Sequence, residues 1–239
     1  MSDQNNWRIA EFDDDFFGNA ISTMWGPVIG GANKGTFTIT ANRVYGTATL
    51  SSGATGTFAN DLTIINLGQK QFTVNNPLGS FFLKVRLNLS SITTNYCFVG
   101  VTDDVTTSEA PISSAASADT ITTTATDACG FMYDTNMATD NWWLTGVASN
   151  VDATHQNSGV APVASQFTTL AMSVDIAGKA IFYINNVIVG TTMTGAVSTG
   201  GVGLSPVIAI SKNSGASSFN CRLDRVYARI VRNVDGTDN

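Results

Sequence analysis

Apolar and polar residues alternate most clearly within 167–191. Apolar residues occupy every second position from 170 to 176, a period of two that is typical of a strand with one buried face. Ala177-Gly178 ends this run, and a second run, rich in β-branched and aromatic residues, covers 179–184. Asn185-Asn186 tolerates positive φ and predicts a tight hairpin. The stretch is therefore expected to form an antiparallel meander.

Two other stretches show the same period. Between Phe81 and Leu89 the odd positions are apolar, which predicts a long sandwich strand with one dry face, and 96–101 is expected to be its neighbour. The last predicted strand, 219–231, changes phase in its middle. A β-bulge near Asp224-Arg225 would return all of its apolar residues to one side of the sheet.

The sequence shows no helical periodicity, because no long segment has apolar residues at i, i+3, i+4 and i+7. Charged residues make up 13% of the chain, against roughly 25% in typical domains. All-β domains of roughly 200–250 residues are common, and this chain has 239. We therefore predict an all-β protein, an antiparallel β-sandwich of the jelly-roll type, with 1–239 as a single domain.

The segment 103–127 departs from this pattern. It is small, polar and low in complexity, and it is predicted to be a long surface insertion because it can bury too little apolar surface to form a core element. A loop of this length is usually functional or mobile, so we expect either an arm that orders against a neighbouring subunit or a flexible insertion. Residues 1–6 and 233–239 are expected to be flexible tails.

Charge and hydropathy argue against several classes of protein. The net charge is −6, and no cluster of Lys and Arg offers a track for phosphates, which disfavours nucleic-acid binding. No apolar run reaches the roughly 18 residues that suggest a membrane span. Residues 1–6 lack the basic start and apolar core of a secretory signal. Three isolated cysteines without a disulfide framework favour folding in a reducing cytoplasm.

Candidate metal ligands are few. Asp13-Asp14-Asp15 could be a calcium site or an exposed turn, and we favour the turn because calcium loops usually space their oxygen ligands at alternate positions. His155 is the single histidine, and without a second histidine or a C-x-x-C pair it is expected to be a surface residue rather than a zinc ligand. We therefore expect no metal and no other cofactor.

The cysteines are three isolated residues, an odd number that does not form a disulfide framework. Buried free thiols are predicted, because each cysteine stands among apolar strand residues. They are Cys97, Cys129 and Cys221.

Trp142 and Trp143 are the candidate contact residues. Neighbours in a strand face opposite sides of the sheet, so one is expected in the core and the other at the surface. An exposed Trp could stack on a sugar ring, fill a subunit interface or cover a sheet edge, and we favour the edge. No catalytic residue is predicted, because no serine or cysteine has a nucleophile-like setting such as G-x-S-x-G.

The meander also carries a family resemblance. Its residues TTLAMSVDIAGKAIFYINNVIVGT resemble the meander of concanavalin A-like (lectin/glucanase, laminin-G-like) jelly rolls, where a strand ending in a vD-type turn precedes a fYinG-type hairpin. FDDDFFG, with Trp25 downstream, and LDRVYARI look like the first and last strands of that fold. Asn186 stands where glycine is common. The resemblance implies a jelly roll over most of the chain.

The composition of the sequence also resembles that of structural proteins of tailed bacteriophages, since the chain is rich in Ser, Thr, Gly and Asn and poor in charged residues. This resemblance implies a non-enzymatic virion structural protein that assembles in the host cytoplasm, as a capsid decoration or cement protein or a head fibre. The expected partners are the major capsid protein or other virion proteins. A homo-oligomer is expected, with a trimer as the first guess because capsids have local threefold axes.

Two other functions are weighed against this one. A carbohydrate-binding, lectin-like module for host-surface attachment would place Trp142 or Trp143 on a glycan. A glycoside hydrolase would need two carboxyl groups beside the scissile bond. The family's E-x-D-x-x-E motif is absent, and Glu11 and Glu109 are far apart in the sequence, so hydrolysis is the least favoured.

Overall fold

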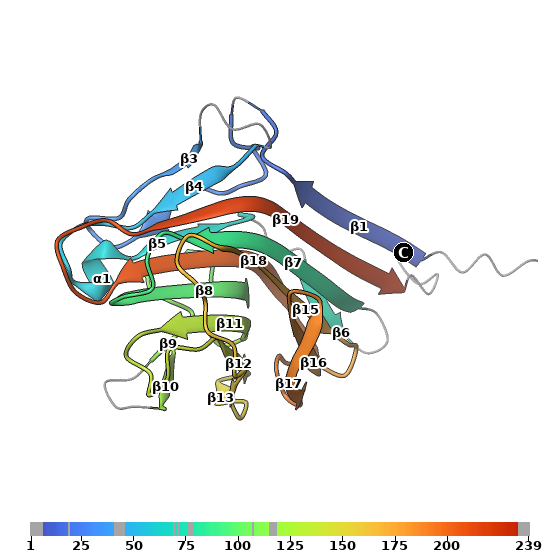
Figure 1. Ribbon diagram of the computed structural model, residues 1–239. Coiled ribbons are helices and arrows are strands. Elements are labelled where there is room, and N and C mark those ends of the chain that lie inside the picture. The colour runs from blue at the N-terminus through green and yellow to red at the C-terminus, as the bar shows by residue number, and fades with distance from the viewer. Residues whose placement is uncertain are drawn as a thin grey trace, which may run out of the picture.

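The computed structural model describes residues 7–18, 20–40, 46–68, 70, 72–75, 79–106, 108–114 and 119–233. Within these ranges the regular structure is strand, apart from the four-residue helix α1 (Phe58–Asp61). Two antiparallel sheets pack face to face as a sandwich (Figure 1). The predicted all-β class and sandwich architecture are confirmed. The predicted tails lie outside the described residues, except for Asn233, which ends the last strand.

Sheet A contains the predicted meander. Its main strands, in spatial order, are β1 (Trp7–Asp14), β19 (Asn220–Asn233), β7 (Gly79–Leu89), β15 (Phe167–Val174), β16 (Ala180–Ile184) and β17 (Val187–Met193). The start of β19 pairs with β4 (Ala48–Ser51), which pairs with β3 (Phe37–Ile39). Asn185 (φ 52°) and Asn186 (φ 66°) close the hairpin between β16 and β17 in the conformation that the sequence predicts.

Sheet B forms the other layer. Its strands, in spatial order, are β2 (Ile29–Gly30), β5 (Thr63–Asn66), β18 (Gly200–Lys212), β8 (Asn95–Thr102), β11 (Ala128–Asp134) and β12 (Trp143–Ala148), with the short β13 (Val151–Asp152) and β14 (Gln156–Asn157) beside β12. β18 joins the layers, because its first residues pair with β6 (Phe72–Asn75) of sheet A.

One predicted pairing is wrong. The stretch 96–101 belongs to β8 in sheet B and does not neighbour β7, which lies in sheet A. The connection between them includes Thr94 at a positive φ of 55° and carries the chain across the sandwich. The two sides of β7 are occupied by β15 and β19 instead.

The phase change in the last strand has the predicted cause. The register between β19 and β7 shifts between Leu223 and Arg225, which is the signature of a bulge. As a result, residues on both sides of the shift point into the same core, among them Cys221, Leu223 and Val226.

The main core lies between the two sheets. β7 alternates buried and more exposed residues along most of its length, as its sequence pattern predicts. The ring of Phe182 from sheet A meets that of Phe131 from sheet B edge to face, with centroids 5.2 Å apart. Each fully buried large apolar side chain contributes roughly 1.5–3 kcal/mol before entropy is subtracted. The prediction of buried free thiols is confirmed for Cys97, Cys129 and Cys221.

The segment 103–127 lies against the outer face of sheet B, where its described part includes the hairpin of β9 (Ile112–Ser114) and β10 (Ile121–Thr123) (Figure 1). Ala110, Ile112 and Ala125 are buried in a second apolar cluster there. The Tyr96 hydroxyl donates a hydrogen bond of 2.5 Å to the carbonyl of Ile112. For these residues the prediction that the segment cannot form part of a core is wrong, because sheet B supplies the apolar surface that the segment lacks.

Candidate functional site

Both candidate tryptophans are buried. Trp142 points into the main core, where its ring centroid lies 5.8 Å from that of Tyr133. Trp143 points to the opposite side, the outer face of sheet B, yet only 7% of it is exposed. The two do face opposite sides, but the expectation that one is exposed is wrong. The second cluster, which includes Met137, covers Trp143, and neither residue is available for a sugar ring.

His155 contributes to this covering. Its ring centroid lies 5.6 Å from that of Trp143, and its Nε2 lies 2.9 Å from the carbonyl oxygen of Asp119. The side chain is half-buried rather than free at the surface. His155 therefore joins the end of the insertion to the face of sheet B.

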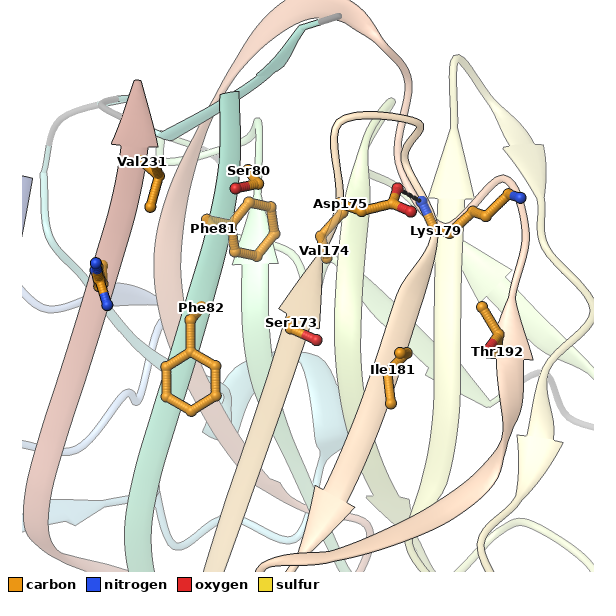
Figure 2. Close-up of a pocket in the computed structure, with 11 residues that line it drawn as sticks. Ser80, Phe81, Phe82, Ser173, Val174, Asp175, Lys179, Ile181, Thr192 and Val231 are labelled. Carbon is orange, nitrogen blue, oxygen red and sulfur yellow. Dashed lines mark hydrogen bonds between the residues drawn. The ribbon is translucent and has the colours of Figure 1, made fainter. Parts of the chain in front are cut away.

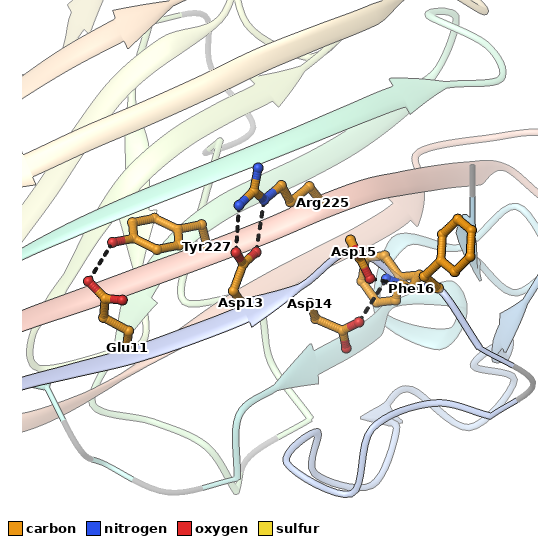
Figure 3. Close-up of polar contacts among 8 residues, drawn as sticks. Glu11, Asp13, Asp14, Asp15, Phe16, Arg225 and Tyr227 are labelled. Atoms are coloured by element: carbon orange, nitrogen blue, oxygen red, sulfur yellow. Dashed lines mark hydrogen bonds and ion pairs between the residues drawn. The ribbon is translucent and has the colours of Figure 1, made fainter.

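The three adjacent aspartates turn to separate partners (Figure 3). Asp13 accepts hydrogen bonds from the Arg225 guanidinium, with Nε at 2.8 Å, and this contact holds the pKa of Asp13 below its usual range. Asp14 accepts a hydrogen bond of 2.8 Å from the indole N–H of Trp25. Asp13 and Asp14 end β1 and pair with Tyr227 and Val226, so the predicted turn is wrong for these two residues, and only Asp15 lies exposed beyond the strand. Within the described ranges, no group of three or more His, Cys, Asp or Glu side chains could hold a metal ion.

The two glutamates are not brought together. Glu11 lies on the outer face of sheet A, where it accepts a hydrogen bond of 3.0 Å from the Tyr227 hydroxyl. Burial and this hydrogen bond raise the pKa of Tyr227. Glu109 lies in the insertion that covers the other side of the sandwich. A shared catalytic role for these two carboxyl groups is therefore excluded by their positions.

The buried aspartates on the sheet B side hold loops in place. Asp134 accepts hydrogen bonds from the Ser114 hydroxyl (2.6 Å) and from the Asn213 amide (2.7 Å). Asp127 accepts one from the backbone N–H of Ser198 (2.6 Å). These contacts join the insertion and neighbouring loops to the sheet, so the outer face of sheet B is a packed surface.

The outer face of sheet A is open instead, and it contains a depression of about 350 Å³ (Figure 2). Residues of neighbouring strands stand in register across it, because Arg229 pairs with Phe82, Phe82 with Ser173, and Ser173 with Ile181. The turn between β15 and β16 closes one side. We call this feature the sheet A depression, and its main lining residues are Ser80, Phe82, Ser173, Ile181, Thr192 and Arg229.

An ion pair and a contact between a cation and an aromatic ring lie on the same face, farther along the strands from the depression. Arg86 contacts Asp224 at 2.6 Å, and its guanidinium carbon lies 4.4 Å from the centre of the Phe167 ring. Exposed ion pairs of this kind typically contribute about 0–1 kcal/mol to stability. These ion pairs therefore place charged groups on the outer face of sheet A but add little to the stability of the fold.

Sequence reasoning missed the depression. The period of two in β7 does place Phe82 opposite the core-facing residues, so an outward aromatic could have been found. The contact of Phe82 with Ser173, Ile181 and Arg229 depends on the pairing of β7 with β15 and with β19, strands that are far from β7 in the sequence.

No protein-family model matches the sequence, and a comparison with curated proteins finds no relative. Solved structures do match. A β-glucanase from Bacillus licheniformis gives a TM-score of 0.57 at 14% identity, with 91% of this chain and 97% of that chain covered. An endo-β-1,4-glucuronan lyase from the fungus Trichoderma reesei gives 0.62 at 9% identity, with 91% and 94% covered. The carbohydrate recognition domain of Emp47p gives 0.57 at 11% identity, with 94% and 95% covered.

This chain has the concanavalin A-like jelly-roll fold. The resemblance inferred from the meander is thus confirmed at the level of fold. The neighbours of this jelly roll include both enzymes and a recognition domain, and a shared fold does not transfer function. Within the described ranges, no helix is long and apolar enough to cross a membrane.

Proposed function

We propose that this jelly roll is a non-enzymatic virion structural protein that acts through protein–protein contacts, as a capsid decoration or cement protein or a head fibre. The contrast between its two outer faces supports the proposal best. The face of sheet B is covered by the chain's own insertion, whereas the face of sheet A is open and combines charged and aromatic side chains. Aromatic residues and arginine are enriched at protein interfaces.

The positions of the acids argue against hydrolysis. Glycosidases place their two carboxyl groups roughly 5–9.5 Å apart across a cleft. In this chain Glu11 and Glu109 lie on opposite sides of the sandwich, and the buried Asp127 and Asp134 are engaged by loop residues. This distribution supports a binding role over a catalytic one.

Sedimentation with capsid shells tests the proposal. The purified protein should pellet with shells assembled from the cognate major capsid protein and stay in solution with shells of an unrelated capsid. Light scattering should show a homo-oligomer, with a trimer as the first expectation. A monomer that stays in the supernatant with cognate shells would contradict the proposal.

The lectin-like alternative has one supporting observation, the similarity in fold to a carbohydrate recognition domain. This alternative required an exposed tryptophan to contact a glycan, but both Trp142 and Trp143 are buried. A glycan array decides between the two functions. Specific glycan binding without capsid binding would favour the alternative.

A further inference from the structure

We infer that the sheet A depression is a docking site for an extended peptide segment of a partner protein, one that presents a carboxylate beside an apolar side chain. The inference rests on the proposed function and specifies where the protein–protein contact is made.

The floor of the depression is apolar. Phe82 and Ile181 are half-buried and stand on either side of Ser173 in the strand register. The ring centroid of Phe82 lies 6.1 Å from that of Tyr227, which supports the ring from the next strand. A volume of about 350 Å³ is at the small end of typical ligand sites, which span about 300–1,000 Å³. An apolar side chain of a partner, rather than a large ligand, fits this floor.

Cationic groups stand on both sides of the floor. Arg229 forms an ion pair with Glu11 through Nε at 3.6 Å, and 40% of its side chain is exposed. Lys179 is exposed at the other side. The acid in the lining, Asp175, accepts the backbone N–H groups of Ala177 (2.8 Å) and Lys179 (2.9 Å) through Oδ1. The exposed parts of Arg229 and Lys179 thus place positive charge on both sides of the floor, where a carboxylate of a partner can pair with it.

The spacing suits an extended segment. Arg229 lies on β19 and Lys179 directly precedes β16, and these two strands are separated by three strand intervals, or roughly 14 Å at about 4.8 Å per interval. Ser80, Ser173 and Thr192 line this path with hydroxyl groups. They can pair with the backbone groups of a peptide that crosses the strands.

Selection from a random heptapeptide library displayed on yeast tests the inference, with the full-length protein as bait. Peptides enriched on the wild type should share Asp or Glu next to an apolar residue. Their binding should weaken at least about tenfold in Phe82→Ser and in Arg229→Gln. The matched controls on the same face, Ile188→Ser and Arg222→Gln, should bind as the wild type does. Circular dichroism checks that all four variants are folded.

Three results would overturn the inference. They are the absence of enriched peptides, enrichment of peptides without acids, and equal binding to the Phe82 and Arg229 variants. Loss of a bound saccharide, rather than a peptide, in the same variants would also overturn it in favour of a glycan site.

Sedimentation of the variants separates this inference from the proposed function. If the variants pellet with capsid shells as the wild type does and no peptide is enriched, the docking site is wrong and the structural role stands. If peptides bind as expected but the wild type does not pellet, the depression is a peptide site and the capsid role is wrong.

Discussion

At the scale of single residues, one buried carboxylate orders the loop before α1. Asp61 accepts hydrogen bonds from the backbone N–H of Thr55 (2.9 Å) and of Gly56 (2.6 Å), and from the Thr55 hydroxyl (2.6 Å). Burial alone would raise the pKa of Asp61, but these hydrogen bonds outweigh it and hold the pKa below its usual value. The ionised carboxylate is therefore the form that stabilises the fold.

Asp61→Asn should lower the free energy of unfolding by about 1–3 kcal/mol at pH 7, because buried N–H groups lose their acceptor. The folded-state pKa is depressed, so the carboxylate's contribution is complete above the ordinary value of 3.8 and is lost as pH falls through the folded-state pKa. Urea unfolding at pH 7 and pH 3 measures this. The difference in the free energy of unfolding between wild type and variant should be smaller at pH 3 than at pH 7. A larger difference at pH 3 would contradict the prediction.

A second residue-scale prediction concerns the turn between β16 and β17. Asn186 has a φ of 66°, a conformation that costs most L-residues roughly 1–2 kcal/mol and glycine almost nothing. Asn186→Ala should therefore destabilise the protein by about 1 kcal/mol in urea unfolding. Asn186→Gly is the matched control, because it also removes the contact with Lys84 but accepts the positive φ. Equal losses in both variants would show that backbone strain is not the cause.

At the scale of elements, the insertion behaves as part of the fold rather than as a loose loop. Ile112 of β9 is fully buried against sheet B, whereas Val151 of β13 is 68% exposed. Ile112→Ala should cost about 2–4 kcal/mol in urea unfolding because it leaves a cavity, and Val151→Ala should change stability little. A loss below about 0.5 kcal/mol for Ile112→Ala would mean that the segment opens independently of the sandwich.

A side chain covers the edge of β17 at Thr191. Gln156 accepts the Thr191 backbone N–H (2.7 Å) and donates to its carbonyl oxygen (3.3 Å), as a neighbouring strand would. Unpaired edge strands promote association between sheets. Gln156→Ala should therefore aggregate faster than the wild type in light scattering at 37 °C, and Asn141→Ala, a nearby polar change, serves as the control. Equal rates for all three proteins would refute this role.

At the scale of the whole molecule, the sandwich shields its thiols. Burial raises the pKa of Cys97 and of Cys129 well above the ordinary value, which suppresses the reactive thiolate. In the native protein at pH 8 an aromatic disulfide reagent should react only as fast as the protein unfolds, and all three thiols should react in guanidinium. A thiol that reacts within seconds in the native state would show an opening that reaches the core.

The sequence by itself determined the class of fold. The period of two in β7 and β15, the Asn-Asn turn and the phase change at Asp224-Arg225 are local patterns, and each specifies which way nearby side chains point. Local patterns also predicted the buried cysteines. They do not specify which strands become neighbours.

Tertiary structure alone decided the rest. It placed β8 in the opposite sheet from β7, buried Trp143 in the second apolar cluster, and separated Glu11 from Glu109. It also assembled the sheet A depression from five strands. A side chain is buried only when other segments pack over it. Which segments do so depends on strand pairing between distant parts of the chain, and no single stretch of the sequence specifies that pairing.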